Sequence, residues 1–513
     1  MVGGLLQLAI YGNEDIYLTG NPQMTFFKSI YRRHTNFSME NLEVQFIGDR
    51  GHIDFADTTT KKISCNLDVN GDLIGNIYFV MRIPNIYTYD LGSNKRLRFR
   101  WVKNLAFNMI KSVSVLVGGK EITKHTGEWM HILNEMTLEK EQKNVLNRIT
   151  GNIPELYDPK NDLGNYPESL TTGTTPPSIR GRLIYIPLSF WFNTKPGLAL
   201  PILALQYNKV ELVVELNSLD NIYTLECYDS VANTSVKYKP KLIEPSSSDH
   251  IKNFLVGTEK SDLGWGLNPY VEVNYIFLDN EERKLFGEMA HEYLIEQVNH
   301  IPNYGIKTEN FISNLLFYNP TKMFVFVCKR SDSKTRNDHN NYTNWFDKDV
   351  NPLLKNFSHY EEWYDENRRL SDKCDTASTY KVGSFALTRD NYDNFSKDII
   401  NQCIIKFNGL NRIKEKSNSY FSLLQKHQHG IKTDDTGILI YSFSINPNQF
   451  EPSGSVNLSG LNKLTVEMKL NEILQPSGSG TYLPKYDYDI DIYQVNYNIF
   501  RVAKGFGSVV FNS

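Results

Sequence analysis

Apolar and polar residues alternate along much of this chain, as they do in strands with one face on a core and the other in water. The clearest run is NKLTVEMKL (462–470), in which every second residue from Leu464 to Leu470 is apolar. Less regular alternation covers 41–46, 209–216 and 270–278. Glycine, proline, asparagine and serine separate such runs, a spacing typical of an all-β sandwich or barrel. Strand and helix patterns do not alternate regularly along the sequence, which argues against a doubly wound sheet.

Two segments have helical rather than strand spacing. In TGEWMHILNEM (126–136), Trp129, Ile132, Leu133 and Met136 fall at i, i+3, i+4 and i+7. Residues 279–298 carry a second stripe, with Asp279 as the predicted N-cap and Glu282 completing a capping box. The second stripe consists of Leu285, Phe286, Met289, Ala290, Tyr293 and Leu294.

Length, charge and cysteine content indicate what class of protein this is. At 513 residues the chain can form two or more domains. A formal charge of −3 argues against a nucleic-acid coat or a binder of anionic membranes. The five cysteines are scattered and odd in number, which argues for a reducing compartment and against a disulfide framework or a zinc finger. The start lacks a basic signal-peptide region, and the sequence shows no apolar run long enough to span a bilayer. We therefore expect a soluble, intracellular protein.

Two short motifs resemble ligand sites and are better explained structurally. VGGKE (117–121) lacks the first glycine of a phosphate loop, so Gly118 and Gly119 are predicted to form a hairpin turn. His427 and His429 match the H-x-H pair of metal-binding β-barrels. Thr433 and Asp434 stand where such barrels need a glutamate, so we expect a structural role for both histidines.

Two charged strands also have competing explanations. YDYDIDIY (486–493) places Asp487, Asp489 and Asp491 on one strand face. A solvated edge that resists aggregation is favoured there over a cation site. KRLRFRW (95–101) interleaves cations with aromatics as a single-strand nucleic-acid binder does. We instead expect its apolar residues to pack inward and its cations to stay outside or to pair at an interface.

Catalysis is not indicated by the sequence. His291 and Glu292 lack the second histidine of H-E-x-x-H, and no G-x-S-x-G elbow occurs. We accordingly predict no enzyme activity, no catalytic residues, no metal and no cofactor.

Six blocks, in order along the whole chain, resemble the major capsid proteins of nucleocytoplasmic large DNA viruses, the algal-virus and giant-virus branch in particular. The blocks begin GGLLQLAIYGNEDIYLTGNPQ, GGKEITKHTGEWMH, IPLSFWFNTKPGLALP, YIFLDNEERKLFGEM, YSFSINPNQFEPSG and VNYNIFRVAKGFG. Six long blocks in register make the resemblance specific. The departures at Asn13-Glu14 and in NPTKMFVFVCKR (319–330) leave a divergent minor capsid paralogue open.

The resemblance implies an all-β double jelly roll, two tandem eight-stranded sandwiches with short helices and long surface loops. Three chains would form a homotrimeric, pseudo-hexameric capsomer that tiles an icosahedral shell. Implied partners are neighbouring capsomers and minor capsid and penton proteins, near an internal membrane and without specific nucleic-acid binding. The implied location is the virion, after assembly in the host cytoplasm. Rival hypotheses are a carbohydrate-binding host-attachment protein, with Trp345 and Trp363 stacking on sugars, and a metal-dependent jelly-roll enzyme.

We predict an N-terminal arm over 1–25, a first jelly roll over 26–220, a polar connection over 221–268 and a second jelly roll over 269–513. The connection contains EPSSSDH (244–250). Each half should have a core of its own, with Trp129 and Phe286 on helices that pack against it. The long loops 151–178 and 331–373 should decorate one end of this framework.

Two groups of residues are the candidate assembly contacts. Three consecutive aromatics cannot all enter one sandwich, so Phe190, Trp191 and Phe192 are candidates for an exposed trimer contact, with the core of one domain as the equal alternative. Arg32 and Arg33 are available for carboxylates of a neighbouring subunit. In the arm, Leu5, Leu6, Leu8 and Ile10 are candidates for an anchor on the inner, membrane-facing side of the shell.

Overall fold

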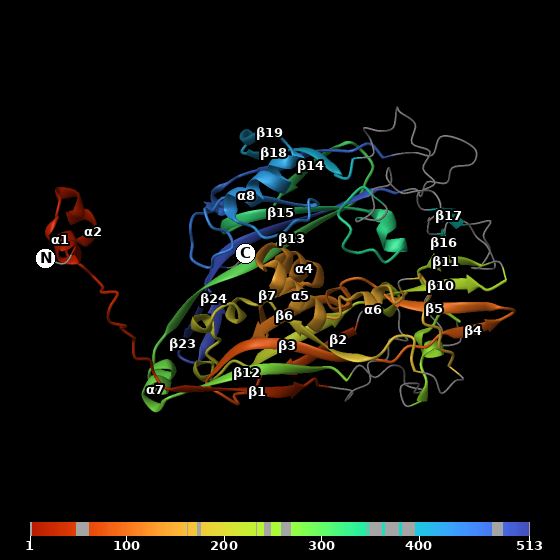
Figure 1. The fold of residues 1–513 in the computed structure, drawn as a ribbon, viewed down its shortest axis with the longest axis horizontal. Coiled ribbons are helices and arrows are strands. Elements are labelled where there is room, and N and C mark those ends of the chain that lie inside the picture. The colour runs from red at the N-terminus through yellow and green to blue at the C-terminus, as the bar shows by residue number, and fades with distance from the viewer. Residues whose placement is uncertain are drawn as a thin grey trace.

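The computed structural model describes residues 3–47, 61–161, 163–171, 176–231, 233–240, 248–257, 268–345, 348, 396–473 and 486–511, together with the backbone of 362–364 and 379–381. Strands dominate these residues and form sheets that are antiparallel except where β16 joins β11, in two stacked bodies with a thin arm projecting from one end (Figure 1). The expected all-β architecture is confirmed. The two bodies are called here the first and the second sandwich.

The first sandwich contains two four-stranded sheets and a longer sheet at its far end. Branched and aromatic residues from all three sheets share one core, in which Phe79, Val115 and Leu212 are almost fully buried. One sheet has the order β1 (Phe37–Gln45), β12 (Tyr270–Leu278), β3 (Leu73–Ile83), β8 (Arg182–Pro187), and another β2 (Lys61–Asn66), β9 (Val210–Leu216), β6 (Ile110–Val117), β7 (Lys120–Thr126). The third has the order β17 (Thr379–Lys381), β16 (Glu362–Tyr364), β11 (Thr234–Tyr238), β10 (Tyr223–Asp229), β5 (Lys95–Trp101), β4 (Tyr89–Gly92).

The second sandwich pairs two sheets around a separate core. Phe324 and Phe326 fill that core from one sheet, and Val466 and Met468 fill it from the other. The first sheet has the order β13 (His291–Ile306), β23 (Tyr488–Ala503), β15 (Pro320–Arg330), β20 (Ile438–Ser442), with β21 (Val456–Asn457) on β15 and β24 (Phe506–Val509) on β23. The second has the order β14 (Asn310–Leu315), β22 (Leu464–Leu470), β18 (Ile400–Phe407), β19 (Leu410–Ser417).

Local chemistry explains several element boundaries. Gly118 and Gly119 have φ angles of +59° and +80° and join β6 to β7, so the predicted hairpin turn is confirmed. Helix α4 (Gly127–Thr137) starts at Thr126, whose hydroxyl accepts a hydrogen bond from the Trp129 amide at 3.1 Å. The other described α-helices are α1 (Gly3–Ala9), α2 (Ile16–Thr19), α3 (Leu105–Met109), α5 (Lys140–Ile149), α6 (Pro154–Tyr157), α7 (Asn280–Glu288) and α8 (Gln425–His429).

Helix α7 is shorter than its predicted stripe. Asp279 is the N-cap, as expected, and its carboxylate accepts a hydrogen bond from the Asn280 amide at 2.7 Å. The helix ends at Glu288, and the chain continues from His291 as the long strand β13. Tyr293 and Leu294 therefore lie on a strand, because pairing of β13 with β23 along its length outweighs the helical spacing of the local sequence.

The division between the two sandwiches falls later than predicted. Strand β12, placed by the sequence in the second half, pairs with both β1 and β3 of the first sandwich. Strands β10 and β11, placed in the connection, pair with each other and with β5. The first sandwich thus extends to Leu278, and residues 241–247 of the expected connection lie outside the described residues. One sheet still mixes the halves, because β16 pairs with β11.

The helices pack differently from the prediction. Trp129, Ile132 and Met136 of α4 pack on the second sandwich, against residues of β15, β20 and β23. Phe286 of α7 packs against Leu73, Ala199 and Ile276, which belong to the first sandwich. The prediction that each helix covers the core of its own half is therefore wrong. Each helix instead contributes to holding the two halves together.

Candidate assembly surfaces

The interface between the two sandwiches within the chain, here called the seam, contains the three consecutive aromatics. Phe190, Trp191 and Phe192 are 0%, 5% and 1% exposed, so the prediction that they project together toward a neighbour is wrong. A single 3₁₀ turn spans Trp191–Asn193, and the rings of Phe190 and Phe192 stack at 5.5 Å while Trp191 lies edge-on to Phe192 at 5.3 Å. The Trp191 ring lies 5.6 Å from the rings of Tyr293 and Phe500, both on strands of the second sandwich. These aromatics join the sandwiches of one chain.

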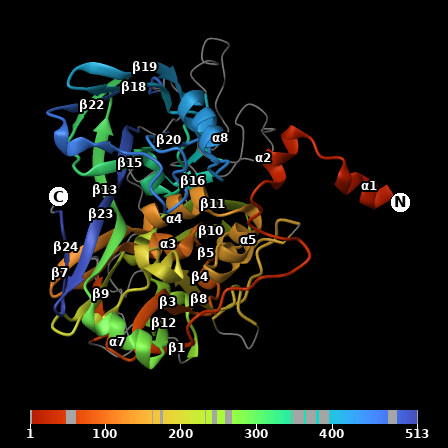
Figure 2. The ribbon, with the colours of Figure 1, turned by 90° about the vertical axis from the view of Figure 1, so that its left-hand side faces the viewer.

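Helix α4 forms the second part of the seam and lies between the two sandwiches (Figure 2). Strand β15 alternates its side chains between two apolar surroundings, with Phe324 and Phe326 in the core and Val325 and Val327 facing α4. The Trp129 ring lies 5.1 Å from Tyr493 of β23. The sequence signal for this contact is the nearly continuous apolar run of β15, because a strand that is apolar on both faces has both faces covered.

Buried charges form the third part of the seam. The Lys329 ammonium of β15 lies 2.7 Å from the Glu128 carboxylate of α4 and 3.3 Å from Asp491 of β23. His300 of β13 lies 2.8 Å from Asp491. Burial alone lowers the pKa of Lys329, but the carboxylates of Glu128 and Asp491 outweigh it and raise the pKa. Lys329 therefore stays charged and links α4 of the first half to a strand of the second.

The aspartates of β23 are not on a solvated edge, so that prediction is wrong. Asp489 and Asp491 are 3% and 2% exposed, on a strand with neighbours on both sides. Asp489 accepts a hydrogen bond from Lys334 at 2.7 Å. Burial raises the pKa of Asp491, and the His300 hydrogen bond and the Lys329 charge bring it below its usual value. Lys334 therefore pairs with the Asp489 carboxylate, and Lys329 and His300 pair with that of Asp491.

A polar segment from the second half, residues 331–345, crosses the seam. The amide side chain of Asn337 donates to the backbone oxygen of Tyr223 at 2.8 Å, and that of Asn108 donates to Asn340 at 2.9 Å. His339 bonds the backbone oxygen of Asn221 at 2.7 Å. The described part of the predicted loop 331–373 is thus a buried connection between the sandwiches rather than a surface decoration.

The charged strand KRLRFRW is β5; its apolar residues pack inward as predicted, but Arg100 is only 5% exposed, so the expectation that the cations stay outside is wrong there. Leu97, Phe99 and Trp101 are buried in the first core. Its cations pair within the chain: Arg98 with Glu168 at 2.9 Å, and Arg100 with Glu226 at 2.5 Å. Burial raises the pKa of Glu226, but Arg100 and the neighbouring cations lower it to about 2. The strand is occupied by these partners rather than open to nucleic acid.

The N-terminal arm is longer than predicted and lies apart from the body in Figure 1, while Figure 2 shows helix α1 projecting beyond the body. Strand β1 starts at Phe37, so the strand expected from Phe26 is absent there, and residues 3–36 are called the arm from here on. Its apolar side chains are exposed, from 52% at Leu6 to 98% at Phe27. Arg32 and Arg33 are also exposed residues of the arm. The arm anchor candidates Leu5, Leu8 and Ile10 are 58%, 81% and 71% exposed.

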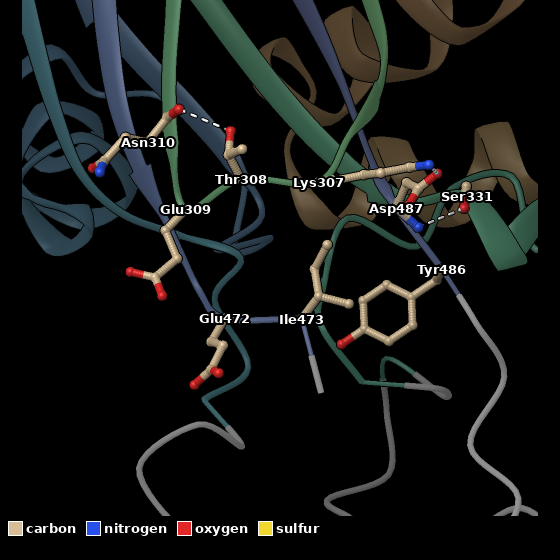
Figure 3. A pocket seen from close by; sticks show the side chains of 9 residues that line it. All are labelled: Lys307, Thr308, Glu309, Asn310, Ser331, Glu472, Ile473, Tyr486 and Asp487. Atoms are coloured by element: carbon tan, nitrogen blue, oxygen red, sulfur yellow. Dashed lines mark hydrogen bonds and ion pairs between the residues drawn. The ribbon is translucent and has the colours of Figure 1, made fainter. Parts of the chain in front are cut away.

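A polar pocket of about 1070 Å³ lies at one end of the second sandwich (Figure 3). Lys307 points toward Asp487 at 4.0 Å, while Glu309 and Glu472 point away from that pair. The Asp487 amide donates to Ser331 at 2.9 Å. No nucleophile and base converge among the residues drawn in Figure 3.

Metal and sugar sites find no support in the described structure. His427 and His429 lie on the helix α8 rather than on a strand, and His429 bonds the backbone oxygen of Ile445 at 2.8 Å. Within the described ranges, no group of three metal-ligating residues occurs. Trp345 is half-buried, with the Lys397 ammonium 5.1 Å above its ring, and the side chain of Trp363 lies outside the described residues.

Cysteine states differ in part from the prediction. Cys65, Cys328 and Cys403 are buried free thiols. Burial raises the pKa of Cys65 and of Cys403 to about 12, so neither thiol is reactive at neutral pH. Cys227 is disulfide-bonded, which counts against the reducing compartment expected from the cysteine pattern. Of the helices in the described part of the chain, none combines the length and the apolar character needed to cross a membrane.

Comparisons with known proteins agree with this architecture. A family model described as the major capsid protein N-terminus matches residues 25–279, and one described as the large eukaryotic DNA virus major capsid protein matches 282–508. The boundary between the two matches falls where β12 ends. The major capsid protein of Phaeocystis pouchetii virus is 29% identical over the full length of both chains. Probable capsid protein 4 of Acanthamoeba polyphaga mimivirus is also 29% identical over both full lengths.

Solved structures share the fold. The quasi-atomic model of the PBCV-1 virus capsid matches with a TM-score of 0.64 at 21% identity, covering 95% of this chain and 100% of that one. The Faustovirus major capsid protein matches with a TM-score of 0.63 at 12% identity, covering 96% of this chain and 94% of that one. The two sandwiches are therefore the expected double jelly roll, and the chain belongs to the family of large eukaryotic DNA virus major capsid proteins, the structural proteins of the virion shell.

Proposed function

We propose that this protein forms a homotrimeric capsomer of pseudo-hexagonal outline, which packs beside identical capsomers to tile an icosahedral shell. The observation that carries the proposal is the buried seam. Trp191, α4 and Lys329 join two sandwiches into one body, so each chain offers two similar flanks. A heterologous contact between such flanks closes after three copies and gives six sandwiches in a ring.

In place of the three buried aromatics, the outer face of the sheet that contains β14 and β19 is the candidate for a subunit contact. Ile312, Leu316 and Leu410 belong to or adjoin this sheet and are 64%, 77% and 77% exposed. The middle strands of this sheet, β22 and β18, carry the Lys406–Glu467 ion pair at 2.6 Å, so the exposed apolar side chains lie at the edges of the face around a polar centre. Phe190, Trp191 and Phe192 are withdrawn as direct contacts because they are already buried within the chain.

The arm is proposed to lie on the inner, membrane-facing side of the shell and to bind minor capsid or penton proteins there. Its support is a set of exposed apolar side chains on a segment that projects from the body. Arg32 and Arg33 would add ion pairs to carboxylates of a neighbour. Assembly is proposed to take place in the host cytoplasm, which rests on the family resemblance, because the disulfide at Cys227 does not favour a reducing compartment.

Sedimentation of the purified protein tests the trimer. The mass should be three times the 59.2 kDa chain mass and should not change on dilution through the micromolar range. Ile312→Asp with Leu410→Asp should shift the mass toward that of one chain while the far-ultraviolet circular dichroism stays unchanged. A control pair on exposed side chains elsewhere, Leu163→Asp with Val231→Asp, should remain trimeric. A stable monomer of the unaltered chain would contradict the proposal.

Deletion of residues 3–36 tests the arm separately. The truncated chain should remain a folded trimer, because β1 and all later elements are intact, but should fail to assemble into closed shells with its partners. Replacing Leu5, Leu6, Leu8 and Ile10 together by serine is the matched full-length variant and should have the same effect. Normal shell assembly by either variant would refute the proposed role of the arm.

A further inference from the structure

The seam shows how one sandwich of this protein packs on the next. Helix α4, which follows β7 of the first sandwich, packs on β15, β20 and β23 of the second. The Gln297 side chain of β13 donates a hydrogen bond to the Ile122 backbone oxygen of β7 at 2.7 Å. Two sheets stay outside the seam and lie on opposite sides of the body, the sheet with β1 and β12 and the sheet with β18 and β19 (Figures 1 and 2).

The outward side chains of β1 and β12 form a surface of the first sandwich that we call the acidic face. Leu42 and Val44 of β1 pack against the first core, so the alternate residues Met39 and Glu43 point outward. Glu43 lies directly opposite Glu272 of β12, and like charges in that position destabilise a sheet. Neither carboxylate is paired with a cation in the part of the chain that the structure describes. The acidic face therefore lacks a counter-charge within the chain.

The outward side of β22 and β18, together with the edge strand β19, forms a surface of the second sandwich that we call the basic face. Met468 and Leu470 fill the second core, so Lys469 between them points outward and is exposed. The Lys406–Glu467 pair on this face balances itself. Strand β19 adds exposed charges that are mostly positive: Arg412, Lys414, Lys416 and Glu415. Among the described residues, no carboxylate pairs with Lys469 or with the three cations of β19.

Each face also has an exposed apolar end, and both apolar ends point toward α7. On the acidic face, Phe37 and Met39 are 50% and 59% exposed, and Phe37 pairs with Leu278, which immediately precedes α7. Strands β13 and β15 run in the same direction, away from α7, because both are antiparallel to β23. Strand β14 ends just before β15 begins, so Leu316 lies toward α7 as well. Pairing across β22 and β18 places Leu410 at the same end of the basic face.

We propose that the acidic face of one chain binds the basic face of a second copy, so that the subunit contact continues the stacking of sandwiches seen at the seam. The apolar ends meet beside α7, and farther along the sheets Glu43 and Glu272 gain the cations of β19 and Lys469. Two acidic faces would repel each other, which disfavours a two-fold dimer and favours a head-to-tail ring. This inference rests on the proposed trimer and names the two faces that close it.

Charge reversal of the full-length protein, followed by sedimentation over a dilution series, tests the pairing. Glu43→Lys with Glu272→Lys brings cations onto both sides of the contact, so the concentration at which trimers dissociate should rise at least about tenfold. Arg412→Glu with Lys414→Glu should weaken the trimer in the same way. The chain with all four substitutions should regain most of the lost affinity, because each contact is again complementary.

The matched control is Glu141→Lys with Glu451→Lys, since both carboxylates are exposed and lie outside the two faces; it should sediment as the unaltered chain does. Glu43→Gln with Glu272→Gln is a milder variant that relieves repulsion within the chain and should still weaken the trimer. Unchanged trimers in the glutamine variant or in a folded reversal variant, or no recovery with all four substitutions, would refute the assignment of the faces and leave the trimer standing. A monomeric unaltered chain would refute the proposed function and this inference with it.

Discussion

Replacing Trp191 by alanine should destabilise the chain without separating its subunits. The side chain is 5% exposed and its ring lies 5.3 Å from Phe192 and 5.6 Å from both Tyr293 and Phe500. Removing a buried tryptophan costs about 3–5 kcal/mol. The aromatic pairs that would be lost contribute about 0.5–1.5 kcal/mol each beyond simple burial, so we expect the upper part of that range. Most of this loss falls on the seam, because Tyr293 and Phe500 belong to the second sandwich.

Urea unfolding followed by tryptophan fluorescence, with sedimentation of the folded variant, measures both effects. Trp191→Ala should unfold at lower urea while its sedimentation below the transition matches that of the unaltered protein. Leu163→Ala, at a position 85% exposed, should change stability by less than about 0.5 kcal/mol. If Trp191→Ala keeps full stability but dissociates into monomers, the ring serves between subunits and the assignment to the seam is wrong.

Further perturbations test other parts of the structure. Lys329→Met should cost about 3 kcal/mol in urea unfolding, the lower end for a broken buried ion pair, because Asp491 keeps His300 as a partner and Glu128 is half-buried. Unchanged stability would show that Lys329 does not link the two halves. Burial lowers the pKa of His125 from 6.5 to about 4, so the unfolded chain binds the proton more readily and stability should fall by roughly 3 kcal/mol between pH 6.5 and 4. His125→Gln should flatten that profile, and an equally steep profile in the variant would assign it to other groups. Gly118→Ala should cost about 1–2 kcal/mol, since φ is +59° and the new Cβ would lie 2.4 Å from Asn208. Gly287→Ala, in open space on α7, should be neutral or stabilising, and equal losses in both would refute the hairpin argument.

Features set by local sequence could be predicted. The alternation in 462–470 becomes β22, the Gly118-Gly119 pair becomes a hairpin turn, and Thr126 and Asp279 start helices. Each depends on residues a few positions apart, whose preferences are visible in the sequence. The inward packing of Leu97, Phe99 and Trp101 follows from the same alternation.

Features set by distant contacts could not be predicted. Asp491 is buried because Lys329, more than a hundred residues earlier, lies beside it. Trp191 is buried because β13 and β23 supply the rings that cover it. Helix α7 ends early because β13 finds a partner in β23. The seam and the late division between the sandwiches both result from such pairings, which leave no local period in the sequence.

The most direct test of the central claim is a density map of the isolated particle by electron cryomicroscopy. The claim is that one chain supplies two adjacent sandwiches joined by a buried seam, and that three chains complete the ring. The map should show six sandwiches in a pseudo-hexagonal ring, with Trp191 density inside each chain and between its own two sandwiches. A ring with a number of chains other than three, or a map in which Trp191 lies between different chains, would contradict the account.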